Sequence, residues 1–322
     1  MSLFFLKSGI LTTVQDLGRN GFRRFGINPN GAMDRTAARL LNVLLGNDET
    51  EALLETHFPA PEILFEENAV FAVGGADFGA KLSGAIVENW KPHYAQKGDV
   101  LKFTAKVFGN RAYLSIRNGF RIEKRLGSAS TNLTAQFGGA KMQKDDRLFF
   151  KQTEINAGNG ANFRISDSLI PFYSRFPIVR AVAGAEFESL TAHGEQTFRN
   201  ENFVVTPESD RMGFRLRGKS IFPLEKKELV SSAVNFGTVQ LLPDGQLIVL
   251  MADAPTSGGY PRLAHVIEAD LPLVAQLGAG DKIAFHLISQ AEAENIFSDF
   301  EKNLHFLKIG VSYSSNLKSI FA

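Results

Sequence analysis

Short runs of β-forming residues, separated by Gly, Asn and Asp, recur along most of the chain and limit the folds that it can adopt. Clear examples are AVFAVGG (69–75), RAYLSIRNG (111–119), ENFVVTP (201–207) and GQLIVLMAD (245–253). Each run mixes apolar or aromatic residues with β-branched ones, and turn residues recur at the spacing typical of barrels and sandwiches. The sequence therefore predicts a mainly β protein.

Helices are predicted in only a few places. In DRTAARLLNVLLGN (34–47), Asp34 is placed to cap the first turn and Gly46 to end the helix. A second helical segment is HVIEADLPLVAQLG (265–278), where Pro272 predicts two short pieces instead of one.

The two halves of the chain resemble each other weakly. RNGF (19–22) is matched by RMGF (211–214), and GDVLKF (98–103) is matched by GDKIAF (280–285). Matches this short also arise by chance, but their common order favours a duplicated β unit. The join between the two copies is predicted in TEINAGNGANFR (153–164), which is rich in Gly and Asn.

Charge and cysteine content argue against several classes of protein. The 322 residues include 35 Lys and Arg against 34 Asp and Glu, a formal net charge of +1, so no field of one sign attracts nucleic acid or an anionic membrane. Cysteine is absent, which excludes disulfides, thiolate nucleophiles and iron–sulfur clusters. The six histidines show no HxH or HExxH spacing, so we expect no metal site.

No targeting or membrane segment is evident. The start, MSLFFLKSGILTTVQD, lacks the basic region and the cleavage site of a signal peptide. No run approaches the ~18 apolar residues that span a membrane. We therefore expect a cytoplasmic protein that binds neither membranes nor nucleic acid.

Common nucleotide and nucleophile motifs are missing. The sequence contains no GxxxxGK[ST] loop, no GxGxxG between a strand and a helix, and no GxSxG. AKMQK (140–144) resembles a biotin attachment loop only superficially, because the residue order is wrong, so we expect no covalently attached biotin on this chain.

The segment from Thr13 to Asp34 is the first candidate site. Its glycines permit close backbone approach, and Gln15, Asp16 and Arg19 supply an amide, a carboxylate and a guanidinium that can bind a small ligand. Equally, Asp16 and Arg19 can pair with each other and fix a turn.

The second candidate is LGSASTNLTAQFGG (126–139). Its hydroxyl residues Ser128, Ser130 and Thr131 lie between glycines, an arrangement that can hold an anionic or carbonyl oxygen. The alternative is a polar hairpin whose hydroxyls satisfy its own turn.

Two further candidates lie in the second half. In ESDRMGFRLRG (208–218), Asp210 and Arg211 either bind a ligand or pair with each other in a turn. In ADAPTSGGYPRLA (252–264), polar residues that include Thr256 and Tyr260 follow a strongly apolar strand, where binding sites are common.

Taken in order, TVQDLGRNG, GAMD, ALLE, LGSAST, SDRMGFRL, GTVQ and TSGGYP resemble the C subunit of bacterial 5-oxoprolinase. The same family is also described as allophanate hydrolase subunit 2, as biotin-dependent carboxyltransferase-like proteins and as antagonists of a kinase inhibitor. The resemblance extends from about Leu11 to about Phe285. It implies two tandem cyclophilin-like β-barrel units with a few short helices. We expect these units at 1–155 and 156–300, followed by a C-terminal extension at 301–322.

The resemblance also implies an activity: ATP-dependent opening of the 5-oxoproline lactam to glutamate, in a complex with proteins like the B and A subunits of that enzyme. ATP is then expected to bind together with a partner subunit. Two alternatives are a carboxyltransferase-type subunit that acts on urea- or allophanate-like amides, and a non-catalytic regulator that binds a kinase-inhibitor partner.

Site residues follow from the same resemblance. The implied catalytic residues, bases or holders of the carbonyl oxygen, are Asp16, Asp210, Ser128 and Thr131. The implied substrate-binding residues are Gln15, Arg19, Arg211, Gln240, Thr256 and Tyr260.

Overall fold

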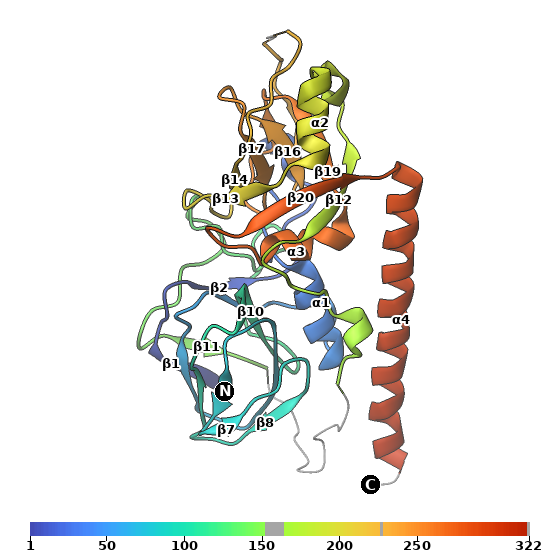
Figure 1. The fold of residues 1–322 in the computed structure, drawn as a ribbon. Helices are drawn as coiled ribbons and strands as arrows, with labels where there is room; N and C mark the ends of the chain where they lie inside the picture. Colours follow the sequence, from blue (N-terminus) through green and yellow to red (C-terminus); the bar gives the residue numbers. More distant parts are fainter. Residues whose placement is uncertain (152–163, 226–227, 321–322) are drawn as a thin grey trace. The chain divides into compact units, whose positions relative to one another are not determined.

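The chain forms two compact units, each assembled from separate stretches of sequence. The computed structural model describes residues 1–151, 164–225 and 228–320 (Figure 1). For residues 314–320 it describes the backbone only. Unit 1 comprises Met1–Arg19, Asp34–Pro171 and Phe300–Ala322. Unit 2 comprises Asn20–Met33 and Phe172–Asp299. The join predicted at 153–164 lies, apart from Arg164, outside the described residues, so the predicted domain limits stay a prediction.

Unit 1 consists of two antiparallel sheets. One sheet has the order β11-β1-β4-β9-β6-β7. Its strands are β1 (Ser2–Lys7), β4 (Glu62–Phe65), β6 (Ala80–Leu82), β7 (Ala85–Ile86), β9 (Val100–Phe103) and β11 (Arg147–Phe149). The other sheet has the order β2-β3-β10-β5-β8. Its strands are β2 (Thr12–Gln15), β3 (Leu53–Thr56), β5 (Ala69–Asp77), β8 (His93–Ala95) and β10 (Phe108–Ile116).

Alternating apolar residues of both sheets form the core of unit 1. Leu3 and Phe5 of β1, together with Phe65 of β4, are fully buried with Phe71 of β5. The rings of Phe65 and Phe71 lie 5.1 Å apart. The burial of these large side chains is the main term that stabilises the unit, at about 25 cal/mol per Å² of apolar surface.

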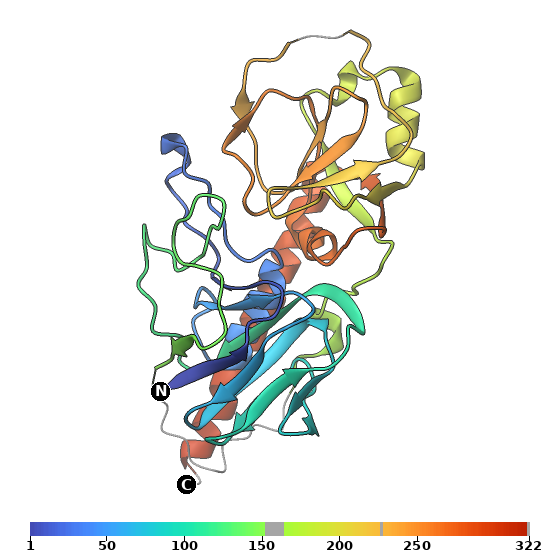
Figure 2. The same ribbon diagram turned by 90° about the vertical axis from the view of Figure 1, so that its left-hand side faces the viewer.

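Unit 2 is a closed barrel with the order β12-β19-β16-β17-β14-β13-β20 (Figure 2). Its strands are β12 (Ile178–Ala183), β13 (Phe203–Val205), β14 (Gly213–Arg217), β16 (Thr238–Leu241), β17 (Leu247–Leu250), β19 (Arg262–Val266) and β20 (Lys282–Leu287). The described pairs are antiparallel except β12 with β20, which close the ring in parallel. A separate two-stranded ribbon joins β15 (Ser232–Ala233) to β18 (Ser257–Gly258).

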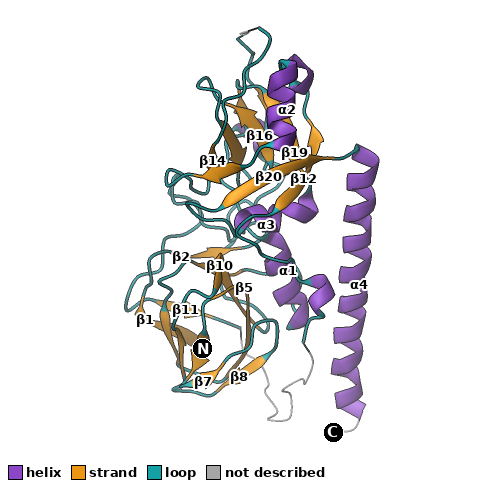
Figure 3. Ribbon diagram, in the orientation of Figure 1, coloured by secondary structure: helices purple, strands orange, loops and turns teal. Residues whose placement is uncertain are grey.

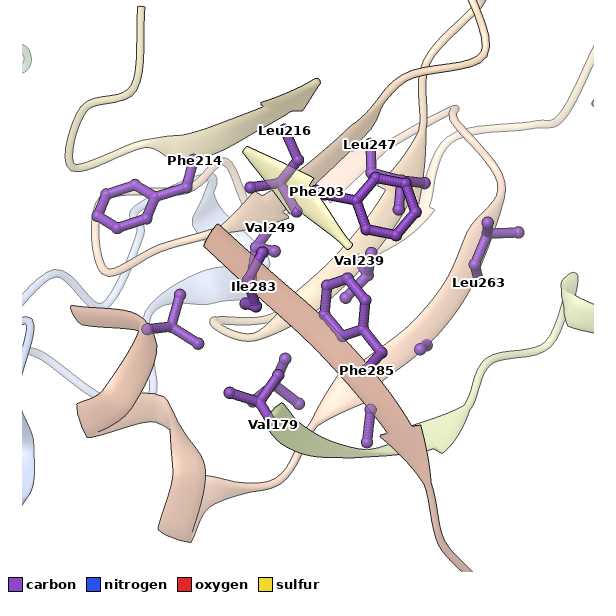
Figure 4. Close-up of a cluster of buried hydrophobic side chains, with 14 of the residues drawn as sticks. Val179, Phe203, Phe214, Leu216, Val239, Leu247, Val249, Leu263, Ile283 and Phe285 are labelled. Carbon is purple, nitrogen blue, oxygen red and sulfur yellow. The ribbon is translucent and has the colours of Figure 1, made fainter. Parts of the chain in front are cut away.

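Aliphatic side chains and several phenylalanines fill the interior of the barrel. Figure 4 shows Phe203 and Phe285, from the neighbouring strands β13 and β20, among the aliphatic residues of the other strands. Phe285 also stacks on Phe198 with ring centroids 4.9 Å apart. These strands are the short runs that the sequence predicted, and the mainly β class is confirmed (Figure 3).

Both predicted helical segments are confirmed. Helix α1 (Arg35–Leu44) begins where the Asp34 carboxylate accepts a hydrogen bond from the Ala37 N–H at 2.8 Å. Gly46 adopts the left-handed conformation just beyond the end of this helix, with φ of 74°. The segment with Pro272 forms two short pieces, η4 (Glu268–Asp270) and α3 (Leu271–Ala275). The remaining short helices are η1 (Arg23–Phe25), η2 (Asp167–Leu169), η3 (Phe187–Ser189) and α2 (Ala192–Asn200).

The long helix α4 (Gln290–Ile320) was not predicted. Its residues from Phe300 onward belong to unit 1, where Arg39 of α1 donates two hydrogen bonds to Glu301 at 2.6 and 2.8 Å. Leu304 and Val311 are buried on the same helix. None of the described helices is long and apolar enough to cross a membrane.

Candidate functional site

Asp16 lies at the centre of a hydrogen-bond network in unit 1. It follows β2 directly, and its Oδ1 accepts hydrogen bonds from the hydroxyls of Ser128 and Ser130 at 2.7 and 2.5 Å. The Gly18 N–H also donates to Oδ1, and the Ala129 N–H donates to Oδ2, both at 2.7 Å. An ionised carboxylate has about four acceptor sites, so this network uses its full capacity. The geometry favours a role for Asp16 in positioning the loop at 128–130.

The hydroxyls of the second candidate segment differ in what they bind. Ser128 Oγ donates to Asp16 and accepts from the Ser130 N–H, while Ser130 Oγ donates to Asp16 and accepts from the Asp16 N–H. The Thr131 hydroxyl makes no hydrogen bond with any described residue. The hydroxyls of Ser128 and Ser130 therefore fix the loop to Asp16, rather than only satisfying their own turn.

Arg19 is buried beneath the same loop. Its side chain is 1% exposed, donates to the carbonyl of Ser130 and lies over the ring of Phe137, 5.0 Å from the centroid. Gly138 is part of this packing, because an added Cβ would overlap the Ser130 carbonyl oxygen and lie 2.7 Å from Arg19 Nη2. The described hydrogen bonds to Asp16 all come from other residues, so the alternative of an Asp16–Arg19 turn pair is wrong.

Gln15 joins the network through its amide. Its Nε2 donates to Thr13 Oγ1 and to the Thr131 carbonyl, each at 3.0 Å. Its Oε1 is buried with no hydrogen-bond donor among the described residues. Five predicted residues of unit 1 thus gather around one loop: Gln15, Asp16, Arg19, Ser128 and Thr131.

Arg211 and Asp253 form the corresponding centre of unit 2. Arg211 Nε and Nη2 bind the two oxygens of Asp253, both at 3.0 Å. Arg211 Nη2 also donates to Asn30 Oδ1 at 2.9 Å and to the Gly31 carbonyl at 2.6 Å. A bidentate pair of this kind fixes both direction and distance. Arg211 therefore anchors the segment at 20–33 to the strand ends of unit 2.

The rest of that segment is anchored in the same way. Arg23 donates to the carbonyls of Val234 and Thr256, and Asn28 Nδ2 donates to the Asp253 carbonyl at 2.8 Å. The predicted residue Thr256 therefore contributes its backbone carbonyl to this contact.

Asp210 does not pair with Arg211, so the predicted turn pair is wrong. Its Oδ1 accepts from the N–H groups of Met212 and Gly213 at 2.7 and 3.2 Å, which forms a turn before β14. The Asp210 side chain is exposed in that turn.

Tyr260 lines a cavity of unit 2, and Gln240 is hydrogen-bonded to it. Gln240 Nε2 donates to the Tyr260 carbonyl at 3.2 Å, and the Tyr260 side chain is 46% exposed. The cavity has a volume of about 540 Å³. Its walls include Phe222, Leu241 and Tyr260, and its charged lining residues are glutamates.

One of these glutamates is paired. Both Glu186 oxygens accept hydrogen bonds from Arg262, at 2.7 to 2.9 Å. The hydrogen bond from Arg262 is the main cause that lowers the pKa of Glu186. The cavity lining is mainly apolar, and Glu186 is a neutralised carboxylate at its wall, together with Glu225 and Glu228.

Several important residues were not among the predicted site residues. Phe137 was given no role, although an aromatic residue between Gln136 and two glycines is a visible signal. Asn30 is buried with φ of 59°, a conformation that Asn tolerates well.

Tyr113 donates from its hydroxyl to Glu55 at 2.7 Å, and burial raises the pKa of this hydroxyl well above its ordinary value. The two residues are 58 positions apart in the sequence, so their pairing leaves no local signal.

A family model matches most of the chain. The model of the carboxyltransferase domain, subdomains A and B, matches residues 25–287. The chain belongs to this family. The segments around Arg211, Asp253 and the loop at 128–131 all lie within the matched carboxyltransferase domain.

Within the family, the chain is similar to two proteins of about its own length. It is 35% identical to the C subunit of 5-oxoprolinase from Haemophilus influenzae over 284 residues, which are 88% of this chain and 90% of that protein. It is 35% identical to the C subunit of 5-oxoprolinase from Escherichia coli over 293 residues, which are 89% of this chain and 92% of that protein. With urea amidolyase of Saccharomyces cerevisiae it shares 29% identity, over 89% of this chain but 17% of that protein.

Solved structures of related proteins agree with the fold. The K. lactis urea amidolyase matches 95% of this chain with a TM-score of 0.87 at 28% identity. The Kluyveromyces lactis urea carboxylase matches 96% of it with a TM-score of 0.87 at 27% identity. The chain spans 20% and 29% of those two proteins.

This carboxyltransferase-domain chain thus carries two well-ordered polar centres, one in each unit. In unit 1 the Arg19 guanidinium is already engaged with Ser130 and Phe137, whereas Gln15 Oε1 and the Thr131 hydroxyl have no hydrogen-bond partner among the described residues. Among the described residues, no three His, Asp or Glu side chains gather closely enough to hold a metal ion.

Proposed function

We propose that this chain is the C subunit of a 5-oxoprolinase-type enzyme, which opens the lactam of 5-oxoproline to glutamate with consumption of ATP. The supporting observation is the match in length: the two relatives named as the C subunit of 5-oxoprolinase are covered over 90% and 92% of their own sequence. The proposed enzyme acts only with partners that resemble the B and A subunits of 5-oxoprolinase.

The proposed chemistry needs a polarised carbonyl and a base. A lactam is a stable amide, so donors placed at its carbonyl oxygen lower the barrier to attack. The loop at 128–131 supplies such donors in this proposal. Asp16 then positions that loop. In unit 2, Asp210 has an exposed side chain and stays a predicted base.

Unit 2 carries predicted substrate-binding residues of its own. Tyr260 lines the cavity, and Gln240 donates a hydrogen bond to the Tyr260 carbonyl. Thr256 and Arg211 act on the protein's own backbone, where they fix the segment at 20–33.

The two predicted site arginines, Arg19 and Arg211, are poorly placed to bind ATP. A triphosphate is bound by cationic side chains or by free backbone N–H groups. Arg19 lies on Phe137 and donates to a carbonyl, and Arg211 is paired with Asp253. We therefore propose that a partner subunit supplies the main ATP contacts, and no step through the nucleotide is assigned to this chain.

Glutamate release tests the proposal directly. The chain is co-expressed with the subunits encoded by neighbouring genes, and glutamate formed from 5-oxoproline is measured with and without ATP. We expect glutamate only when ATP and this chain are both present. A well-formed complex that releases none overturns the proposed substrate.

The observation that supports the carboxyltransferase alternative is the TM-score of 0.87 to the urea amidolyase and urea carboxylase structures. In that case the complex would act on urea or a related amide. It would need a biotin carboxylase and a biotin carrier from other chains. Carboxylation of urea by the reconstituted system, without glutamate release from 5-oxoproline, would decide for it.

The regulator alternative depends on the surface around Tyr260. Phe222 and Tyr260 are 49% and 46% exposed beside the apolar cavity, which suits a bound protein segment. Binding of a kinase-inhibitor protein at this cavity, with no turnover of either amide, would decide for this role.

A further inference from the structure

The polar groups of the loop at 128–131 are not equally available to a ligand. The carboxylate of Asp16 already accepts four hydrogen bonds. The hydroxyls of Ser128 and Ser130 each donate to that carboxylate and each accept a backbone N–H. A carbonyl oxygen of a ligand could bind either hydroxyl only by displacing Asp16, because each hydroxyl has one O–H to donate and the carboxylate has none.

Thr131 is different. Its hydroxyl makes no hydrogen bond with a described residue, although the side chain is only 2% exposed. In contrast to Gln15 Oε1, its Oγ1 is not among the atoms sealed from solvent. The side chain is thus held inside the unit, while its hydroxyl remains able to bind a molecule from solvent.

The backbone around Thr131 holds this hydroxyl in place. The Thr131 N–H donates to the Val14 carbonyl at 3.0 Å, and the Thr131 carbonyl accepts from Gln15 Nε2. A β-branched side chain on a backbone fixed at both ends has little rotational freedom. The direction of the hydroxyl is therefore set before any ligand arrives.

Gly139 leaves open the space next to this hydroxyl. A Cβ added at Gly139 would lie 2.6 Å from Thr131 Oγ1, closer than side-chain atoms approach each other. The glycine therefore keeps the oxygen free of a covering side chain.

We propose that the Thr131 hydroxyl binds the substrate, by donating a hydrogen bond to the carbonyl oxygen of the amide that is opened. The inference rests on the proposed function for the identity of that amide. Gln15 is a positioning residue for Thr131, and Ser128 and Asp16 shape the loop without contacting the substrate.

An isosteric substitution tests this role. Thr131→Val removes the hydroxyl and keeps the shape, whereas Thr131→Ser keeps the hydroxyl. In the reconstituted complex, we expect Thr131→Val to lower kcat/KM for 5-oxoproline about tenfold, because one hydrogen bond to the substrate is lost. Thr131→Ser should retain most of the activity.

Thermal unfolding separates this role from a structural one. The hydroxyl has no partner among the described residues, so Thr131→Val should leave Tm unchanged. A lowered Tm with unchanged kcat/KM would assign the hydroxyl to stability and overturn the proposal. Full activity at unchanged Tm would overturn it as well.

A second variant closes the space that Gly139 leaves. Gly139→Ala should weaken substrate binding, while Gly84→Ala should not. Gly84 also has a positive φ, of 94°, but an added Cβ there meets no atom within 4 Å. Equal kinetics of the two variants would contradict access to Thr131 past Gly139.

Binding without turnover keeps the inference independent of the proposed reaction. The wild-type complex is titrated calorimetrically with 5-oxoproline and, separately, with urea, in the absence of ATP. Binding of urea alone would overturn the proposed substrate but leave Thr131 testable, since Thr131→Val should then weaken urea binding about tenfold. Equal affinity of wild type and Thr131→Val, or no binding of either amide, overturns the inference.

Discussion

Asp16 in unit 1 and Asp253 in unit 2 are both buried carboxylates, but their hydrogen-bonding needs are met in opposite ways. Asp16 is 4% exposed and accepts its hydrogen bonds from hydroxyl and N–H groups. Asp253 is 6% exposed and is bound by the guanidinium of Arg211. Neutral donors join Asp16 to a loop more than a hundred positions later in the chain, whereas the ion pair joins two residues that are 42 positions apart.

This difference predicts different sensitivity to substitution. Removal of the carboxylate from a buried ion pair leaves the charge of its partner uncompensated. Removal of a carboxylate from neutral donors leaves only unpaired dipoles. The uncompensated charge costs more free energy, so we expect unit 2 to lose more stability than unit 1 when its carboxylate is replaced.

The greatest loss is expected for Asp253→Ala. Arg211 would then lose its carboxylate while its contacts to Asn30 and Gly31 remain, and the free energy of unfolding should fall by about 3–5 kcal/mol. Denaturant unfolding of the whole chain measures this. As a control, Lys97→Ala removes an exposed pair with Glu67 and should change the stability by less than about 1 kcal/mol. Similar losses of unfolding free energy for both variants would mean that the buried Asp253–Arg211 pair stabilises the fold no more than an exposed pair does.

Gly138→Ala should be the next most harmful change. The added Cβ would overlap the carbonyl of Ser130 and press on Arg19, so the loop that Asp16 holds must shift, at about 1–3 kcal/mol in addition to backbone strain. Gly26→Ala is the matched control, because Gly26 has a similar φ of 76° and no atom within 4 Å of an added Cβ. Equal unfolding free energies for the two variants would show that the loop adapts without cost.

Asp16→Asn should cost about 2 kcal/mol, less than either change above. Asparagine keeps one acceptor oxygen, but its NH₂ group faces donors, so some of the four hydrogen bonds are lost. Faster hydrogen exchange of the Ala129 amide would locate the damage. Unchanged protection of that amide would contradict a positioning role for Asp16.

The weakest effect concerns Glu186, a third carboxylate, which is less buried than the other two. The hydrogen bond from Arg262 lowers its pKa from 4.5, so the stability that this pair contributes is present above pH 4.5 and is lost as the pH falls through the lowered pKa. The difference in Tm between wild type and Glu186→Gln should therefore shrink as the pH is lowered below 4.5. A difference that is constant between pH 7 and pH 3 would show that the charge of Glu186 contributes nothing.

Local signals predicted the local structure well. The strand runs, the Asp34 cap and the break at Pro272 depend on neighbouring residues, and all three are confirmed. Helix α4 (Gln290–Ile320) was missed because apolar residues occur on both of its faces. Leu304 is buried while Phe306 is 67% exposed, so the usual period of one apolar face is hidden.

The candidate site was predicted as a set of segments, but its pairings were not. Asp16 receives its donors from a loop more than a hundred residues away, and Arg211 finds its carboxylate at Asp253, not at Asp210. Partners this distant leave no trace in the local sequence, so the nearest opposite charge was the natural but wrong candidate.

The assignment of Asn20–Met33 to unit 2 has a consequence for how the chain is made. These residues leave the ribosome near the start of synthesis, yet Val234 and Asp253, to which they bind, are made much later. At about 5–20 residues per second, the segment waits on the order of ten seconds or more for its partners. Unit 1 waits longer still, since it is completed by Phe300–Ala322. Neither unit can therefore finish folding before most of the polypeptide has been made.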